Sequence, residues 1–488
     1  MDFVTPSYYL YFLPIVFILT IGLASKRRRA QILILLSMSY VFFWLASGWH
    51  IILLLISTCI DWTAGQRMQR SEDIQYRKRW LKVSLITNLS ILGIFKYLDF
   101  LIESFNLVSL KFTEGLDIST FDLALPVGIS FYTFQTMSYT IDIFRKKQKP
   151  YDSFLDFACY AAFFPQLVAG PIERASNLLP QFFKARSFDY YQAVDGMRQI
   201  LWGLFKKAVI ADNCAVHANE IFNNSGDYSG AHLFLGAFFF AFQIYGDFSG
   251  YSDIAIGTSR LFGFDLMQNF NFPYFSRDIA EFWRRWHISL STWFRDYLYI
   301  PLGGSRGGTW MKVRNTFIIF IVSGFWHGAN WTFIVWGVLN AIYFLPLLLT
   351  NSNRNNLATV AQGKLLPSIK ELLFMSLTFG LTVFTWIFFR SENIGHAISY
   401  ISEIFSPSLL SSPYYPGIGL AIPTIILTVL FVLIEWFGRE GQFAISHIGQ
   451  KWYRPLRWTF YSLLIFIIGM FFGIFLGTLN SKDVTKVF

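Results

Sequence analysis

Residues 30–65 read AQILILLSMSYVFFWLASGWHIILLLISTCIDWTAG, and this stretch decides the class of fold. It contains two apolar blocks, residues 30–46 and 51–65. Each is close to the length of about 20 residues at which a helix crosses the hydrocarbon core of a bilayer. The stretch therefore predicts consecutive membrane-spanning helices.

The composition of the whole chain supports the same class. Of its 488 residues, 54% are hydrophobic, 19% are aromatic and 14% are charged, whereas a soluble domain carries about 25% charged residues. The candidate spans are residues 8–25, 30–46, 51–65, 83–103, 123–144, 155–170, 196–212, 231–246, 251–266, 314–326, 331–350, 370–389, 418–437 and 457–478. Some are short or broken by glycine and proline. We predict an all-α, polytopic integral membrane protein with about 11–13 transmembrane helices plus re-entrant or interfacial helices.

The distribution of basic residues predicts the topology. The net charge is +10, but the bases lie in short loops between apolar blocks, which is typical of cytoplasmic loops and argues against a nucleic-acid partner. Basic runs at 26–29, 67–82 and 145–149 are separated by even numbers of spans. They are therefore expected on the cytoplasmic side, with the N-terminus extracytoplasmic. The basic run follows the first apolar block, so we expect residues 8–25 to be a retained helix and not a cleaved signal peptide.

The chain is predicted to form a single membrane domain over residues 1–488. Residues 1–149 supply N-terminal helices and residues 150–350 supply the core that carries the chemistry. A polar loop at 351–369 separates this core from C-terminal helices at 370–488. No soluble domain is expected at either end.

Two acidic residues fall within the apolar stretch IYGDFSGYSDIAIG at 244–257. Intramembrane carboxylates are costly and usually face a cavity or a partner. Asp247 and Asp253 could pair with nearby arginines where Gly246 and Gly250 allow close helix packing. The alternative is that the glycines break the helix and that the carboxylates line a substrate path.

The segment RDIAEFWRRWHISLSTWFRDYLYIPLGGSRGG at 277–308 is the most polar part of the centre. Read as one helix, it places four polar side chains on one face, namely Arg284, His287, Ser291 and Arg295. Glu281 is spaced to pair with Arg285. Such a helix suits the membrane surface or the wall of a wet cavity.

The glycine-rich end of this segment, residues 303–308, has two interpretations. The glycines could form a flexible turn, or their N–H groups and Arg306 could bind phosphate. The spacing matches neither the dinucleotide fingerprint nor a P-loop.

The stretch SGFWHGANW at 323–331 places one histidine, His327, in an apolar region. It is either a core residue or a base in a water-poor pocket, with Ser323 and Asn330 as polar neighbours. No HExxH or GxSxG pattern supports a metal site or a serine triad. The three cysteines, Cys59, Cys159 and Cys214, are scattered and imply no metal or disulfide framework. The residues alone indicate a membrane enzyme or a transporter with a buried histidine.

Five segments taken in order resemble the membrane-bound O-acyltransferase family, in its branch similar to the bacterial alginate O-acetyltransferase membrane subunit. They are LPVGISFYTFQTMSYTIDIFR (125–145), FFPQLVAGPIER (163–174), YGDFSGYSDIAIG (245–257), EFWRRWHISLSTWFRDYLYIPLGGSRGG (281–308) and SGFWHGANWTFIVWG (323–337). The resemblance implies helices around a central funnel or tunnel and transfer of an acyl group to a hydroxyl.

The resemblance also implies roles for individual residues. His327 matches the family's catalytic histidine, and His287 its second polar position. The expected donor is acetyl-CoA, with no permanently bound cofactor and no metal. Candidate substrate-binding residues are Arg284, Arg285, Arg295, Arg306, Asn330 and Ser291, of which the four arginines are the candidates for binding the donor's phosphates. Candidate tunnel-lining residues are Asp247, Ser249, Asp253 and Trp326.

The resemblance further implies a bacterial cytoplasmic-membrane enzyme that passes acetyl groups to an exported cell-surface polysaccharide. An extracytoplasmic acetyltransferase or export protein would then present the acceptor. The C-terminal residues 477–488 lack the aromatic-rich end expected of close relatives. D-alanyl transfer to teichoic acid is one alternative, and a transporter or flippase of lipid-linked sugars is the other.

Overall fold

The computed structural model describes residues 3–109, 118–168, 170–413, 418–449 and 452–478. These residues form helices, turns and loops and contain no strand, which confirms the prediction of an all-α protein. The part of segment 477–488 that follows Thr478 lies outside the described residues. The chain divides into two compact units. Unit 1 comprises residues 1–193, 259–269 and 287–353, and unit 2 comprises residues 194–258, 270–286 and 354–488.

Unit 1 is built from the N-terminal helices and from two later helical segments. Its α-helices are α1 (Leu13–Phe17), α2 (Arg28–Ser47), α3 (Ile51–Gln69), α4 (Ile74–Leu92), α5 (Leu98–Ser109), α6 (Ile129–Phe144), α7 (Phe154–Ala162), α8 (Phe164–Leu167), α9 (Ala175–Leu178), α14 (Ile288–Phe294), α15 (Gly308–His327) and α16 (Trp331–Leu349). Its π- and 3₁₀-helical segments are η1 (Tyr8–Phe12), η2 (Ile18–Leu23), η3 (Gly48–His50), η4 (Gly93–Tyr97), η5 (Leu179–Phe183) and η9 (Arg295–Tyr299).

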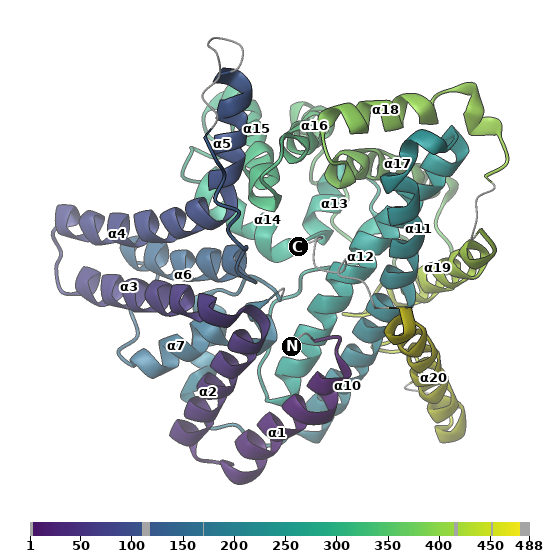
Figure 1. The fold of residues 1–488 in the computed structure, drawn as a ribbon. Coiled ribbons are helices and arrows are strands. Elements are labelled where there is room, and N and C mark those ends of the chain that lie inside the picture. The colour runs from purple at the N-terminus through teal and green to yellow at the C-terminus, as the bar shows by residue number, and fades with distance from the viewer. Residues whose placement is uncertain (1–2, 110–117, 169, 414–417, 450–451, 479–488) are drawn as a thin grey trace. The chain divides into compact units, whose positions relative to one another are not determined.

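Helices α3, α4 and α6 lie side by side and pack together (Figure 1). A buried polar network links the first two. The carboxylate of Asp61 accepts hydrogen bonds from Ser84 Oγ at 2.5 Å and from Asn88 Nδ2 at 2.9 Å. Buried polar groups of this kind need such partners because an unsatisfied one is costly.

Helices α15 and α16 pack as a hairpin because glycines let their backbones approach. A Cβ at Gly324 would lie 2.2 Å from the Phe333 carbonyl oxygen, and one at Gly337 would lie 2.3 Å from that of Phe320. Asn330 begins α16, its side chain accepting a hydrogen bond from Thr332 N at 3.0 Å. The glycines of the 323–337 segment are thus required for packing.

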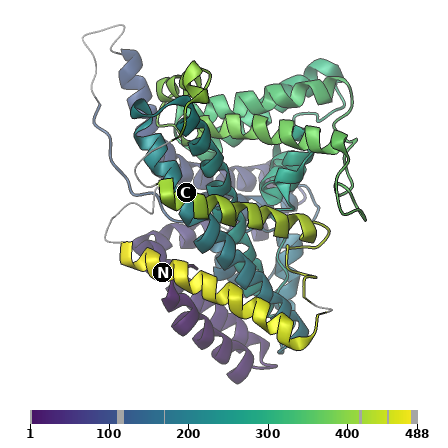
Figure 2. The same cartoon turned by 90° about the vertical axis from the view of Figure 1, so that its right-hand side faces the viewer.

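Unit 2 contains the remaining helices. They are α10 (Tyr190–Leu204) and α12 (Gly230–Leu261), which belong mostly to it, and α11 (Asp212–Asn223), α13 (Ile279–Arg285), α17 (Ile369–Arg390), α18 (Ile394–Ile404), α19 (Ile418–Gly438) and α20 (Arg454–Thr478), with η6 (Phe205–Ala211), η7 (Ser225–Asp227), η8 (Pro273–Phe275) and η10 (Pro407–Leu410). Figure 2 shows α20 in yellow as one long helix. Both α19 and α20 contact η6.

The structure excludes a break at 246–250, one of the two alternatives left open by the sequence, because α12 runs without interruption from Gly230 to Leu261 (Figure 1). Its glycines serve close packing. A Cβ at Gly246 would lie 2.9 Å from the Lys206 carbonyl oxygen, and one at Gly250 would lie 2.7 Å from that of Gly203. The alternative based on close helix packing is therefore the one that the structure supports.

Six stretches of the described residues are long and apolar enough to cross a membrane. They are Arg28–Gln69, Ile74–Ser109, Gly230–Leu261, Trp331–Leu349, Ile369–Arg390 and Ala421–Gly438. The polytopic helical class is confirmed, and the stretch Arg28–Gln69 contains two full helices. The predicted 11–13 crossings outnumber these six stretches partly because two predicted blocks, 231–246 and 251–266, form the single helix α12, and partly because other apolar blocks fold as short helices. The block at 155–170, for example, forms α7 of 9 residues and α8 of 4.

Candidate active site

His327 is the last residue of α15, where the chain leaves the helix. Its ring centroid lies 4.9 Å from that of Trp326 and 5.2 Å from that of Trp336. The residue as a whole is half-buried at the end of the helix. Of the two predicted polar neighbours, Ser323 is buried in the preceding turn of α15, whereas Asn330 lies beyond the helix and caps α16.

His287 lies in a break between two short helices, which corrects the prediction of one continuous helix over this segment. Helix α13 ends at Arg285, α14 begins at Ile288, and His287 between them has a left-handed φ of 43°. This conformation is uncommon for a residue other than glycine. The face proposed to join Arg284, His287, Ser291 and Arg295 therefore does not form.

The loop around Asn269 fixes the backbone at His287. Ile288 N donates to the Asn269 carbonyl oxygen at 2.9 Å, and Ser289 Oγ donates to Asn269 Oδ1 at 2.6 Å. Ile172 N donates to Ser289 Oγ at 3.0 Å. Residue 172 belongs to the GPIER segment, so two of the segments that carried the family resemblance are joined by a hydrogen bond.

The structure brings His287 and His327 together although 40 residues separate them in the sequence (327 − 287). Their ring centroids are 6.4 Å apart, and both belong to unit 1. His287 is 1% exposed. Burial, and secondly the neighbouring His327, lower the pKa of His287 well below its ordinary value. Its imidazole is therefore neutral near neutral pH.

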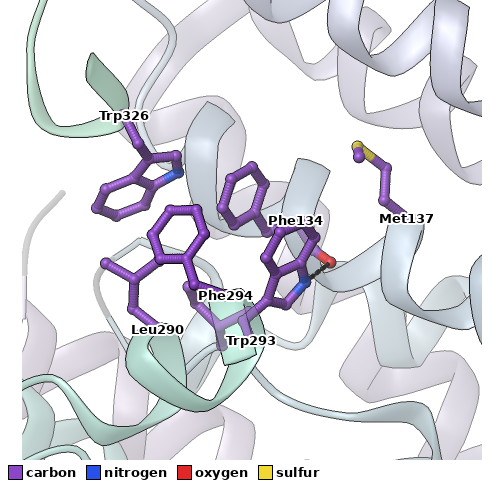
Figure 3. Packing of buried hydrophobic residues seen from close by; sticks show 7 residues of the cluster. Phe134, Met137, Leu290, Trp293, Phe294 and Trp326 are labelled. Atoms are coloured by element: carbon purple, nitrogen blue, oxygen red, sulfur yellow. Dashed lines mark hydrogen bonds between the residues drawn. The ribbon is translucent and has the colours of Figure 1, made fainter. Parts of the chain in front are cut away.

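An aromatic cluster supports the residue that precedes His327. The Trp326 side chain packs with Phe134, Leu290, Trp293 and Phe294 in one buried cluster (Figure 3). Trp293 stacks on Phe134 with ring centroids 4.0 Å apart, and its Nε1 donates to the Phe134 carbonyl oxygen at 2.9 Å. Trp326 is only 5% exposed, so a packing role is established for it.

The sequence alone did not identify two further residues, Lys96 and Tyr97, which contact the end of α15 from η4. Lys96 Nζ donates to the Trp326 carbonyl oxygen, and Tyr97 Oη donates to that of Phe325 at 2.9 Å. A lysine inside a long apolar block is an unusual position, and this was the signal that could have identified Lys96.

The predicted phosphate-binding arginines occupy two different environments. In unit 2, Arg285 pairs with Glu281 at 2.9 Å, as the spacing predicted, and is 7% exposed. Arg284 donates to the Asn356 carbonyl oxygen at 2.8 Å. In unit 1, Arg295 has a side chain 59% exposed and pairs with Asp296, and Arg306 is exposed in the glycine-rich turn.

The glycine-rich region forms a turn tied to α15. Gly303, Gly304 and Gly308 have positive φ values of 101°, 57° and 80°. Asn315 Nδ2 donates to the Gly304 carbonyl oxygen at 3.0 Å. Ser291, a further candidate binding residue, lies partly exposed on α14, and its N donates to the His287 carbonyl oxygen at 3.0 Å.

The acidic residues of α12 pair with lysines rather than with the arginines that were expected. In unit 2, Asp253 lies 2.5 Å from Lys206 Nζ, and Lys207 Nζ lies 2.7 Å from Asp247 and 2.8 Å from Asp212. Ser249, also predicted to line the tunnel, is buried and donates to the Tyr245 carbonyl oxygen at 2.6 Å. Among the described residues, no group of three or more His, Cys, Asp or Glu could hold a metal ion.

The fold is that of a polytopic helical membrane protein, and comparison with known proteins identifies its class. The chain belongs to the membrane-bound O-acyltransferase family, whose model matches residues 36–388. It is therefore an acyltransferase and a multi-pass membrane protein, and the transporter alternative finds no support.

Similar proteins refine this placement. A probable alginate O-acetylase of Pseudomonas aeruginosa is 38% identical over 88% of this chain and 79% of its own length. A peptidoglycan O-acetyltransferase of Helicobacter pylori is 34% identical over 82% of this chain and 79% of its own. A teichoic acid D-alanyltransferase of Bacillus subtilis is 30% identical, but over only 44% of this chain and 57% of its own length.

Proposed function

We propose that this chain transfers an acetyl group from acetyl-CoA to hydroxyl groups of, or on the way to, an exported cell-surface polysaccharide, with His327 as the proton acceptor. The observation that carries the proposal is the histidine pair, two imidazoles from distant segments with ring centroids 6.4 Å apart. The names of the relatives similar over most of the chain supply the acyl group and the acceptor class.

The chemistry is a direct transfer between two bound substrates. The acceptor hydroxyl gives its proton to the imidazole of His327, and its oxygen attacks the thioester carbonyl. The carbon–sulfur bond then breaks, and the CoA thiolate takes up the proton held by His327, which restores the neutral imidazole. The neutral imidazole of His287 supplies one N–H donor, which we assign to the acyl carbonyl oxygen.

The aromatic surroundings favour transfer over hydrolysis. Trp326 and Trp336 lie beside His327 and both are 5% exposed or less. Exclusion of water by such rings protects an activated donor. Among the four arginines considered for the donor phosphates, Arg295 and Arg306 are exposed, whereas Arg285 is buried against Glu281. We therefore propose that Arg295 and Arg306 bind the phosphates of the donor.

The proposed acceptor rests on the relatives, and the proposed topology rests on the distribution of basic residues. Both O-acetylating relatives are named for a polysaccharide, alginate in one case and peptidoglycan in the other. We propose a bacterial cytoplasmic membrane location with the N-terminus outside, and an extracytoplasmic partner that presents the polymer. D-alanyl transfer ranks second because the similarity to its enzymes covers 44% of the chain.

The test replaces His327 with alanine and follows label from [¹⁴C]acetyl-CoA in membrane vesicles. O-acetyl ester on the extracellular polysaccharide of the same cells is measured alongside. Loss of a general base lowers transfer about 10²–10⁴-fold. The matched control is His447→Ala, which removes an exposed histidine of unit 2, and both variants are compared at equal amounts in the membrane.

Two outcomes would overturn the proposal. Wild-type transfer by inserted His327→Ala protein would remove His327 from the chemistry. Transfer from a D-alanyl donor, with none from acetyl-CoA, would move the second-ranked function to first place.

A further inference from the structure

The last turn of α15 has backbone carbonyls that its own helix cannot satisfy. The final four C=O groups of an α-helix have no intrahelical partner. The carbonyl of Gly324 accepts a hydrogen bond from Gly328 N at 3.4 Å. Those of Phe325 and Trp326 accept from Tyr97 Oη and Lys96 Nζ, which come from a different helix. Two consecutive side chains therefore hold two consecutive carbonyls directly before His327.

Ring contacts reinforce both hydrogen bonds. The Tyr97 ring stacks on that of Phe325 with centroids 4.1 Å apart and planes at 13°. Lys96 Nζ lies 5.4 Å from the centre of the Trp326 ring, within the range of a cation–π contact. It also donates to Ser130 Oγ of α6 at 3.3 Å. The contacts fix Lys96 on two sides.

The two residues end the π-helical segment η4, at Gly93–Tyr97. This is one of five π-helical segments in the described residues, so its position, and not its π-helical form, carries the argument. This one lies within the candidate span Ile74–Ser109, where an ammonium group is costly unless it has polar partners. The carboxyl end of a helix carries partial negative charge and stabilises a nearby cation. The end of α15 thus accounts for the position of Lys96.

The geometry points to Lys96 and Tyr97 as positioning residues that hold the end of α15 and thereby set the place of His327 for acyl transfer. This inference rests on the proposed function of His327. Neither residue is assigned a bond to substrate. Misplacement of a catalytic group by about 1 Å can lower a rate about 10²-fold, so the hold on this turn affects turnover directly.

The surroundings of His327 disfavour the protonated form of its imidazole. His327 lies outside the candidate spans. The titratable groups that interact electrostatically with its imidazole are Lys96 and His287. The rings beside it are those of Trp326 and Trp336. Burial, and secondly the charge of Lys96, lower the pKa of His327 to about 3. The rate also depends on how well the imidazole is aligned with the acceptor hydroxyl, which the end of α15 sets.

The experiment compares four variants of the full chain in lipid nanodiscs. Lys96→Met removes the donor and the charge, Lys96→Arg keeps both, and Tyr97→Phe removes only the hydroxyl. Lys82→Met is the matched control, because Lys82 is exposed on α4 of the same span. Two quantities are measured, namely kcat and KM for acetyl-CoA, and hydrogen–deuterium exchange of the peptide spanning residues 320–335.

Lys96→Met is expected to lower kcat about 10–100-fold with KM for the donor changed less than about threefold. Tyr97→Phe is expected to lower kcat about 3–10-fold, since one neutral hydrogen bond is lost. Both should speed exchange in the 320–335 peptide. Lys96→Arg should keep kcat within about threefold of wild type, and Lys82→Met should change neither quantity.

Several results would overturn the inference. Unchanged exchange in Lys96→Met and Tyr97→Phe would show that these residues do not hold the helix end. Higher kcat in Lys96→Met would show that basicity outweighs position. If Lys96→Met does not insert into the membrane, Tyr97→Phe alone decides the question. Wild-type kcat and unchanged exchange in Tyr97→Phe would then refute the positioning role.

The exchange measurement separates this inference from the proposed function. If His327→Ala keeps full activity, the proposed function fails, while exchange at 320–335 still reports whether the helix end is held. If His327→Ala is inactive and Lys96→Met keeps wild-type kcat and exchange, only the inference fails.

Discussion

Residues 323–331 and 244–257 both place ionisable groups in apolar sequence, but the structure treats the two stretches differently. In 244–257, the carboxylates of Asp247 and Asp253 meet lysine ammonium groups at 2.7 Å and 2.5 Å. In 323–331, His327 has tryptophan rings, a lysine and a second histidine as neighbours. The carboxylates of the first stretch are neutralised by lysines of η6, whereas the second stretch sets an imidazole beside another imidazole.

This difference indicates different roles. Buried charges that are paired within one unit hold helices together, and removing one partner leaves the other uncompensated. A histidine at a helix end, beside another histidine in a rare backbone conformation, has the features of a reactive site. We therefore expect substitutions in 244–257 to act mainly on stability and substitutions at the histidines to act mainly on turnover.

The largest effect in this comparison is expected from Lys207→Met. This change leaves both Asp212 and Asp247 without the ammonium that lies 2.8 Å and 2.7 Å from them. Breaking a buried ion pair destabilises a protein by about 3–5 kcal/mol. The thermal unfolding midpoint in detergent should fall clearly, while kcat per folded molecule should stay within about threefold of wild type.

Lys364→Met is the control for this prediction, because Lys364 is an exposed lysine of the same unit. A Lys207→Met protein with the wild-type midpoint but almost no turnover would break the comparison. The α12 carboxylates would then return to the tunnel-lining role that the sequence suggested.

His287→Ala is expected to have the next largest effect, a fall in kcat of about 10–100-fold, within the range for an acid–base or hydrogen-bonding group. Alanine also fits poorly at a left-handed φ of 43°. His287→Asn should retain more activity, since asparagine tolerates this conformation and keeps a donor. Measurement of kcat together with the unfolding midpoint separates the side-chain effect from the backbone effect.

Asn351→Ala provides the matched control, because Asn351 is an exposed residue of unit 1 with a φ of 54°. It should lower stability by about 1–2 kcal/mol and leave kcat unchanged. Equal kcat in His287→Ala and wild type would limit the site to His327 alone.

The helical class and most helix positions were predictable from the sequence. Apolar length alone located α2, α3, α16 and α17 within a few residues. The break at His287 was not predictable, because RDIAEFWRRWHISLSTWFRD has an unbroken helical pattern. Its interruption depends on Asn269, a residue distant from α14 in sequence that binds Ile288 and Ser289.

The site was predictable only in part. Residue types and the family resemblance identified His327 and His287, but neither could show that the two rings meet. The role of Lys96 depends on carbonyls some 230 residues away in sequence, which no local pattern encodes. Likewise, the i,i+4 pairing of Glu281 with Arg285 was predictable, whereas the lysine partners of the α12 carboxylates were not, since they lie on η6.

The smallest expected effect concerns pH. An imidazole reacts with diethyl pyrocarbonate in its neutral form, and that form dominates above its pKa. Because burial and the charge of Lys96 lower the pKa of His327 to about 3, lowering the pH from 8.0 to 5.5 should change its modification rate less than about twofold. The modification of an imidazole with the ordinary pKa of about 6.5 would slow about tenfold over this interval.

Mass spectrometry of the 320–335 peptide measures the rate, with exposed His447 as a reference for reagent activity. A tenfold decline at His327 would mean that water and counter-charge reach this imidazole freely. The difference between the histidine pair and the charge-paired carboxylates of α12 would then rest on geometry and not on a lowered pKa.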